Sequence, residues 1–186
     1  MLVGRFPYGT HPRFLLQLEL EFADGQTQTV VTDGSWRTTQ DGPIRATGIY
    51  DGETCDARHE QPGWARAGFD DRAWSSARAF DRDARKLVWL RNEPIRVVQE
   101  LKPIQLTEPR PGAYVFDLGQ NMVGWCRIDA IGAAGQTVTI RHAEMLNDDG
   151  TLYTANLRAA PQVNRYTPRD DRSEEHTSEL QSRQVI

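Results

Sequence analysis

The strongest constraint on the fold is a strict alternation of apolar and polar side chains near the start of the chain. The apolar positions are Leu16, Leu18, Leu20 and Phe22, and polar residues stand between them. A β-strand sends successive side chains to opposite faces, so this period is typical of a half-buried strand. The turn signal Asp24-Gly25 and a β-rich run over residues 27–32 follow directly. A β-hairpin over residues 16–32 is therefore predicted.

Short segments bounded by turn residues continue along the rest of the chain. The strand candidates are residues 35–39, 44–50, 114–118, 123–131 and 137–143, and residues 147–150 (Asn-Asp-Asp-Gly) predict a tight turn. Residues 60–86 predict an irregular loop, and residues 87–101 a strand or connector interrupted at Pro94. Short strands with regular turns favour an antiparallel sandwich.

The predicted fold class is all-β, with two incomplete antiparallel β-sandwich segments of jelly-roll type. The first covers residues 1–100 and the second residues 101–171. Each is short for a complete sandwich of about 100 residues. We expect the first segment to lack strands before Met1 and the natural protein to continue beyond Asp171.

The last residues have a different character. The string from Arg172 to Ser182 resembles the translation of a sequencing-adapter oligonucleotide. Residues 172–186 are therefore expected to be a non-native tail, never selected to pack and making few contacts with either β segment.

Composition excludes several classes of function. Lys plus Arg number 22 and Asp plus Glu number 26, which gives a formal net charge of −4. This balance offers no basic surface for nucleic acid and no polybasic arm for an anionic membrane. The longest apolar stretches are about four residues long, far short of the roughly 20 needed to span a bilayer. Two cysteines cannot build a disulfide framework. The start of the chain shows no secretory signal, and the compartment stays open.

Several strings carry a family resemblance when they are taken in order. They are Tyr8-Gly9, residues 15–19 (LLQLE), 32–36 (TDGSW), 49–54 (IYDGET), 56–58 (DAR), 68–71 (GFDD), 116–125 (FDLGQNMVGW), 141–144 (RHAE), 149–153 (DGTLY) and 156–158 (NLR). Together they resemble the N-terminal, non-catalytic half of bacterial α-L-rhamnosidases. Cys55 and Cys126 depart from the residues usual in that family.

The resemblance implies two β-sandwich domains, an N-terminal domain and a concanavalin-like domain, which precede a catalytic (α/α) barrel. The family removes terminal α-L-rhamnose from glycosides by an inverting mechanism. Its two catalytic carboxylates lie in the barrel, so no catalytic residue is expected here and the chain alone is expected to be inactive. The expected partners are a rhamnose-containing glycoside and the missing barrel. A free-standing carbohydrate-binding module and a structural spacer are the alternatives.

The densest acidic cluster is the main candidate site. Asp51, Glu53 and Asp56 lie close together, with Arg58 after them. Inverting hydrolysis needs an acid and a base about 6.5–9.5 Å apart, and residues 51 and 53 would share a strand face. The more ordinary interpretation is that Asp51-Gly52 forms a turn. We expect these residues to line a sugar site or contact a neighbouring domain.

Three further residues complete the candidate set. Trp64 lies in the predicted loop and is the tryptophan best placed to stack on a sugar, whereas Trp36 and Trp125 are expected in the core. His142 and Glu144 would share a strand face, and a packed or interface pair is more typical of this spacing than a metal site. No metal ligands are assigned. Some N-terminal domains of the family bind rhamnose through calcium, but the ligands have no counterpart that can be placed in this sequence, and no other cofactor is expected.

Overall fold

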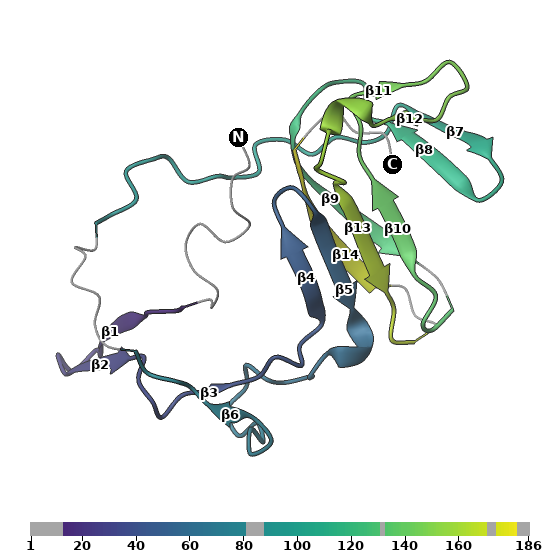
Figure 1. Ribbon diagram of the computed structural model, residues 1–186. Coiled ribbons are helices and arrows are strands. Elements are labelled where there is room, and N and C mark those ends of the chain that lie inside the picture. The colour runs from purple at the N-terminus through teal and green to yellow at the C-terminus, as the bar shows by residue number, and fades with distance from the viewer. Residues whose placement is uncertain (1–12, 81–87, 131–132, 171–173, 182–186) are drawn as a thin grey trace. The chain divides into compact units, whose positions relative to one another are not determined.

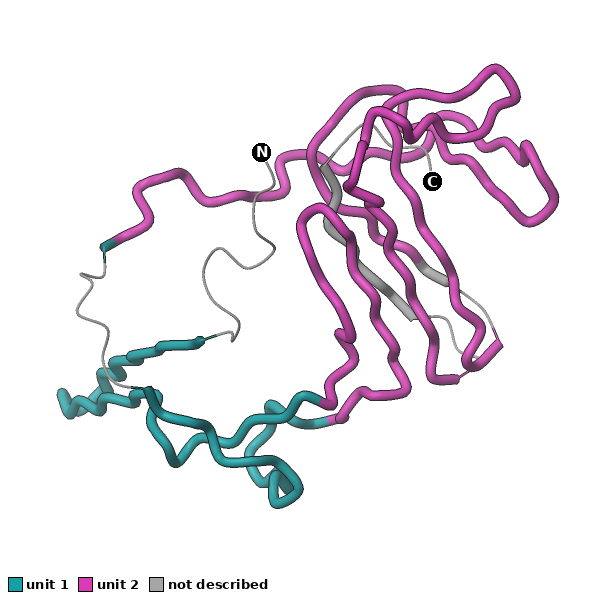
Figure 2. The backbone as a smooth tube through the Cα atoms, viewed as in Figure 1, with its two compact units in different colours: residues 1–40, 63–88 teal, residues 41–62, 89–186 magenta. Residues whose placement is uncertain are grey.

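The computed structural model describes residues 13–80, 88–130, 133–170 and 174–181 (Figure 1). These residues form β-strands and two short 3-10 helices and contain no α-helix, so the chain is all-β as predicted. No helix in the described part is long and apolar enough to cross a membrane. The chain forms two compact units: residues 1–40 with 63–88, and residues 41–62 with 89–186 (Figure 2).

The first unit contains the predicted hairpin. β1 (Gln17–Glu21) pairs antiparallel with β2 (Thr27–Val31), from Gln17 opposite Val31 to Glu21 opposite Thr27. Gly25 has a φ of +80°, and its N–H donates to the Phe22 carbonyl across the turn. The expected strand pair is confirmed, but the expected half-burial of the first strand is wrong, because all five β1 residues are exposed. Leu18, Leu20 and Phe22 are 46%, 36% and 48% exposed. β3 (Arg37–Thr38) pairs with β6 (Ser75–Ser76) in the same unit.

The second unit is organised around a four-stranded sheet in the order β10-β13-β5-β4. Its strands are β4 (Ile44–Gly48), β5 (Gly52–Asp56), β10 (Val138–Arg141) and β13 (Val163–Thr167). β4–β5 and β10–β13 are antiparallel, whereas β5 and β13 run parallel. The sheet thus joins strands within residues 44–56 to strands within residues 138–167, a pairing that the predicted antiparallel segments did not include.

Three two-stranded ribbons complete the second unit. They are β7 (Gln105–Arg110) with β8 (Ala113–Asp117), β9 (Val123–Ala130) with β14 (Glu174–Gln181), and β11 (Met145–Leu146) with β12 (Leu152–Tyr153). The strands predicted at residues 114–118, 123–131 and 137–143 correspond to β8, β9 and β10. The predicted turn at residues 147–150 is confirmed, since the Gly150 N–H donates to the Asn147 carbonyl at 2.9 Å. Residues 89–103 form no strand and are a connector.

The core of the second unit lies in the four-stranded sheet. Cys55, Ala57 and Tyr166 form a buried cluster, and Ile140 on β10 and Val163 on β13 are also buried. Cys55 of β5 lies opposite Tyr166 of β13 in the parallel register. The central strands β5 and β13 thus contribute Cys55, Val163 and Tyr166 to the buried apolar side chains.

The expectation that the tail makes few contacts is wrong for residues 174–181. These residues form β14, which pairs with β9 at eight successive positions, from Glu174 opposite Ala130 to Gln181 opposite Val123. Strand pairing uses backbone N–H and C=O groups, so a segment needs no selected side chains to occupy an open edge. The assignment of residues 172–186 as non-native stays a prediction, as do the domain limits at residues 100 and 171.

Gly52 provides a test of the β5–β13 contact. Its φ is +88°, and a Cβ built there would lie 2.4 Å from the Val163 carbonyl oxygen. Gly52→Ala should destabilise the second unit by more than about 2 kcal/mol, because backbone strain and a backbone clash combine. Gly112→Ala is the control, since its φ is +76° with nothing within 4 Å of the added Cβ. Urea unfolding followed by circular dichroism measures both, and equal losses would contradict the clash.

Removal of β14 tests the edge of β9. Deleting residues 172–186 leaves the N–H and C=O groups that face β14 without partners, and such edges promote pairing between chains. The shortened chain should therefore self-associate with rising concentration more strongly than the full chain. Sedimentation velocity at several concentrations measures this. A shortened chain that stays monomeric wherever the full chain does would show that β9 needs no partner strand.

Candidate functional site

The turn between β4 and β5 is held against the start of β13 by four hydrogen bonds. The carbonyls of Ile49, Tyr50 and Asp51 accept from the Gln162 Nε2, the Gln162 N–H and the Val163 N–H, at 2.7, 3.2 and 3.1 Å. The fourth bond joins the Glu53 N–H to the Asn164 Oδ1 at 2.6 Å. We call Gln162, Val163 and Asn164 the clasp. It satisfies backbone groups of the turn that would otherwise be unpaired.

The local backbone explains how three successive residues reach the turn. Gln162 has a φ of +47°, an unusual value for a residue other than glycine, and it directly precedes β13. This conformation lets both its side chain and its backbone N–H bond to the turn. Gly52 lacks a side chain where the Val163 backbone passes. Both positions show a backbone built for close approach.

Asn164 also contacts a buried histidine. The Asn164 Nδ2 lies 3.1 Å from the His142 Nε2, and His142 is only 1% exposed. Burial lowers the pKa of His142 to about 4. The imidazole is therefore neutral at physiological pH, and its side chain is shielded from solvent.

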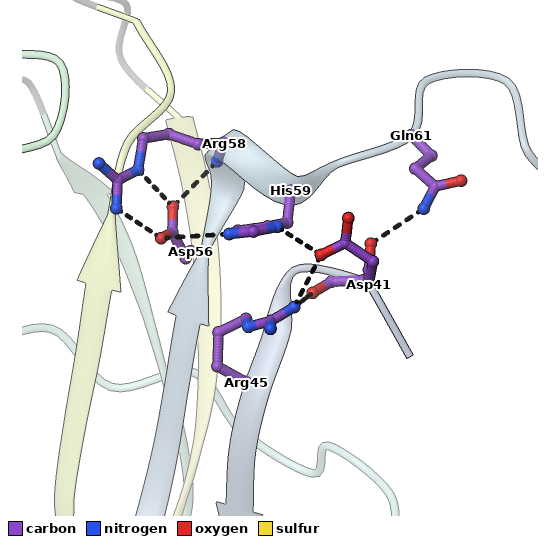
Figure 3. Close-up of polar contacts among 7 residues, drawn as sticks. Asp41, Arg45, Asp56, Arg58, His59 and Gln61 are labelled. Carbon is purple, nitrogen blue, oxygen red and sulfur yellow. Dashed lines mark hydrogen bonds and ion pairs between the residues drawn. The ribbon is translucent and has the colours of Figure 1, made fainter. Parts of the chain in front are cut away.

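A second polar group lies where β5 ends (Figure 3). Asp56 accepts from the Arg58 Nε and Nη2 at 2.8 and 2.7 Å, and from the Arg58 N–H at 3.1 Å. The last bond makes Asp56 the N-cap of the 3-10 helix η1 (Ala57–His59). Its side chain is 12% exposed. The hydrogen bonds from Arg58 lower the pKa of Asp56 to about 2.

Asp41 extends this group through His59. The His59 Nδ1 lies 2.7 Å from the Asp41 Oδ1, and the His59 Nε2 lies 3.9 Å from the Asp56 Oδ2. The Arg45 Nη1 also lies 3.2 Å from the Asp41 Oδ1. The backbone carbonyl of Asp41 accepts a hydrogen bond from the Gln61 Nε2 at 2.9 Å. Figure 3 shows His59 between the two carboxylates. The contacts join the start of the β4–β5 hairpin to the segment that leaves it.

This geometry is suited to holding structure rather than to proton transfer. A general acid must be protonated at the working pH, and a carboxyl group with a pKa of about 2 is ionised. Both Asp56 oxygens already accept from Arg58. Within the described residues, no group of three or more His, Cys, Asp or Glu side chains could hold a metal ion.

The structure separates the residues of the predicted site. Asp51 lies in the turn between β4 and β5, which confirms the turn interpretation, and Glu53 and Asp56 lie on β5. β10 ends at Arg141, so His142 and Glu144 do not share a strand face as predicted; Glu144 is exposed at a bend. Trp64 is 65% exposed and belongs to the other unit. Trp125, expected in the core, is 38% exposed.

Sequence reasoning missed the residues that make most of these contacts. They are Asp41, His59, Gln61, Gln162 and Asn164. Asp41 stands in an Asp-Gly-Pro string that indicates only a turn, and Gln162 and Asn164 lie in a polar stretch without periodicity. The one local signal was the Asp-x-Arg spacing at residues 56–58. The same spacing recurs at residues 70–72, where the Arg72 Nε and Nη2 likewise donate to the two Asp70 carboxylate oxygens.

The carboxylate in the polar turn at residues 147–150 is likewise bound by neighbouring residues of this chain. Asp149 accepts from the Thr151 N–H at 3.0 Å and from the Arg110 Nη2 at 3.1 Å. The hydrogen bonds from Thr151 lower the pKa of Asp149. Its carboxylate stabilises the β11–β12 turn.

Comparison with known proteins places the chain in a family. The model of the α-L-rhamnosidase N-terminal domain matches residues 2–99, and that of the bacterial α-L-rhamnosidase concanavalin-like domain matches residues 107–183. The chain belongs to the bacterial α-L-rhamnosidase family. The predicted resemblance is thus confirmed.

Individual rhamnosidases extend far beyond the matched region. The chain is 47% identical over 167 residues to an α-L-rhamnosidase of Streptomyces avermitilis, and 41% identical over 158 residues to one of Formosa agariphila. These matches cover 89% and 83% of the chain but only 16% and 17% of the relatives. The chain therefore spans about one sixth of their length.

Solved rhamnosidase structures share the fold of this chain. The Streptomyces avermitilis enzyme complexed with L-rhamnose matches 92% of the chain and 17% of its own, with a TM-score of 0.85 and 44% identity. The enzyme from Dictyoglumus thermophilum matches 92% of the chain and 20% of its own, with a TM-score of 0.83 and 35% identity. The family models also show that β4 and β5 belong to the first matched region, and β10 and β13 to the second.

Asp56 provides a test of the group at the end of β5. Asp56→Asn removes the negative charge that forms the ion pair with Arg58. This change should lower the free energy of unfolding by about 1–2 kcal/mol. Because the pKa of Asp56 in the folded chain lies below the ordinary aspartate value of 3.8, this contribution is complete above about pH 4 and is lost as the pH falls toward 2. Urea unfolding at pH 7 and at pH 2.5 measures both effects.

Asp70 gives a matched control for that experiment. It accepts from Arg72 with the same fork distances of 2.8 and 2.7 Å, but the two side chains are 60% and 88% exposed. Asp70→Asn should change the free energy of unfolding much less than Asp56→Asn does, because solvent screens an exposed ion pair. Equal losses in the two variants would contradict a special role for the Asp56 position.

Proposed function

We propose that this chain is an accessory, non-catalytic portion of an inverting glycoside hydrolase that removes terminal α-L-rhamnose from glycosides. The observation that carries the proposal is the coverage of the comparisons. The match extends over 89% of this chain and only 16% of the Streptomyces avermitilis relative. A region of this size supplies two small β-rich parts of a much larger enzyme, and the catalytic carboxylates then lie in the remaining part, in an (α/α) barrel.

The connector at residues 89–103 supports a partner within the longer protein. Four of its apolar side chains are between 79% and 95% exposed: Trp89, Leu90, Ile95 and Val98. Exposed apolar groups at this density are typical of a surface that packs against another element. The barrel of the parent enzyme is the partner that the coverage favours.

The geometry of the candidate residues supports a structural role for most of them. The Asp51 carbonyl and the Glu53 N–H are bound by the clasp, and Asp56 is bound by Arg58. His142 is buried against Asn164. These contacts favour an interface between the two matched regions over a sugar-binding surface.

One observation favours a carbohydrate-binding module as the second candidate. Trp64 is 65% exposed in a loop, and aromatic faces stack on the apolar faces of sugars. A module of this kind would bind rhamnose without hydrolysing it.

The first test is of hydrolysis. The purified chain should not release the aryl group from an aryl α-L-rhamnoside, because the proposed acid and base are outside it. Absorbance of the released phenolate measures turnover. Steady turnover that survives repurification, and that is lost in both Asp51→Asn and Glu53→Gln, would overturn the proposal.

The second test separates an accessory portion from a binding module. Calorimetric titration with L-rhamnose, with and without calcium, should give no saturable heat if the role is structural. Saturable binding that is lost in Trp64→Ala but kept in Trp89→Ala would favour the module. Trp89 is a suitable control because it is 92% exposed.

A further inference from the structure

The directions of the hydrogen bonds around Asn164 fix the protonation state of His142. The Glu53 N–H can only donate, and it lies 2.6 Å from the Asn164 Oδ1. The donating Nδ2 therefore faces the His142 Nε2 at 3.1 Å. Because the amide nitrogen only donates, Nε2 must accept, and neutral His142 carries its proton on Nδ1.

The opposite side of the imidazole offers no alternative anchor. The His142 Nδ1 is buried and has no hydrogen-bond partner among the described residues. Asn164 is therefore the contact that sets the tautomer, and Asn164 itself is only 2% exposed. The Glu53 N–H, the Asn164 amide and the imidazole form a chain of three hydrogen-bonding groups. The donor in one hydrogen bond of this chain determines which atom donates in the next.

Charged side chains on the surrounding elements do not take over this role. Arg141 at the end of β10 and Arg165 on β13 are exposed, whereas the neighbouring His142 and Asn164 are buried. The remaining charged residues near the turn or after β10 are Asp51, Glu53 and Glu144, of which Asp51 and Glu144 are exposed and Glu53 enters through its backbone. Burial is the sole cause of the lowered pKa of His142. The imidazole thus responds to solvent protons rather than to a neighbouring charge.

We propose that His142 and Asn164 form a proton-sensitive latch that fastens the β4–β5 turn to β13. When the imidazole takes up a solvent proton at Nε2, two donors face each other across the contact. Asn164 must then withdraw or rotate its amide, and in both cases the Glu53 N–H loses its acceptor. The latch goes beyond the proposed function and does not depend on it.

The consequence is an acid-labile joint between the two matched regions. β5 lies in the first and β13 in the second, and the Glu53–Asn164 bond is one of four that hold the turn. Loss of this bond loosens the turn while the β4–β5 and β10–β13 ladders remain. Opening is thus local and does not require unfolding of the sheet.

Hydrogen exchange in the full chain tests the latch directly. The protection factor of the Glu53 amide, corrected for intrinsic exchange, is measured by NMR at pH 7 and pH 4.5. Protection should fall on the order of 50-fold, as expected when an open imidazole of ordinary pKa competes with a closed one of pKa about 4. The Asp56 amide, bonded to the Pro43 carbonyl at 2.8 Å in the same sheet, should change little. Glu53 protection that does not vary with pH, or that falls in parallel with Asp56, overturns the latch.

Three variants separate protonation from mere packing. His142→Gln keeps an acceptor toward Asn164 but does not titrate, so Glu53 protection should become independent of pH. Asn164→Asp can accept from both the Glu53 N–H and a protonated Nε2, so it should raise the pKa of His142 and keep Glu53 protected at pH 4.5. His59→Gln removes a partly exposed histidine outside the latch and should leave the 50-fold fall intact. A fall that persists in His142→Gln overturns the proposal.

The unmodified chain gives a readout that needs no variant. The ¹⁵N chemical shifts of His142 at pH 7 distinguish the two neutral tautomers. The latch requires the proton on Nδ1. A proton on Nε2 would mean that Asn164 presents its oxygen to the ring, and the proposal would fail.

Discussion

The parallel pairing of β5 with β13 is the contact on which the second unit depends. It places Cys55 beside Tyr166 and completes the buried cluster. The bond from Glu53 to Asn164 closes a separation of 111 residues, and such closure loses chain entropy before any contact forms. Local strand pairing cannot offset this loss. The clasp, the buried cluster and the close approach at Gly52 all act at the same junction.

Polar groups at this junction act differently from apolar ones. The cluster of Cys55, Ala57 and Tyr166 stabilises any arrangement that keeps it away from water. The amide of Asn164 accepts only one orientation, because an oxygen and a nitrogen have different partners on its two sides. In a buried setting an unmatched donor is expensive. Burial thus holds the strands together, and hydrogen-bond direction fixes their register.

The parts of the fold that could be predicted from the sequence are those with a local signal. The β1–β2 hairpin follows from a period of two and one Asp-Gly turn, and β8, β9 and β10 follow from similar runs. β5 was not predicted because its first residues carry turn signals, and its parallel partner β13 lies far away in the sequence, at Val163–Thr167. Asn164 and His59 acquire their roles only from that pairing, so no spacing along the chain reveals them. β14 shows the converse: its side-chain pattern predicted no packing, but its backbone pairs along all eight residues.

The four-stranded sheet takes two strands from each matched region. The two matched regions follow one another in the sequence, but the hydrogen bonds between β5 and β13 join one region to the other. If one matched region were replaced by the corresponding region of an unrelated protein, only two of the four strands would remain. The edge of β13 that pairs with β5 would then lose its partner strand and the β4–β5 turn. The two matched regions are therefore expected to be inherited together. The Gly52 and Asn164 positions should change together or not at all, although they lie in regions that sequence comparison treats as separate.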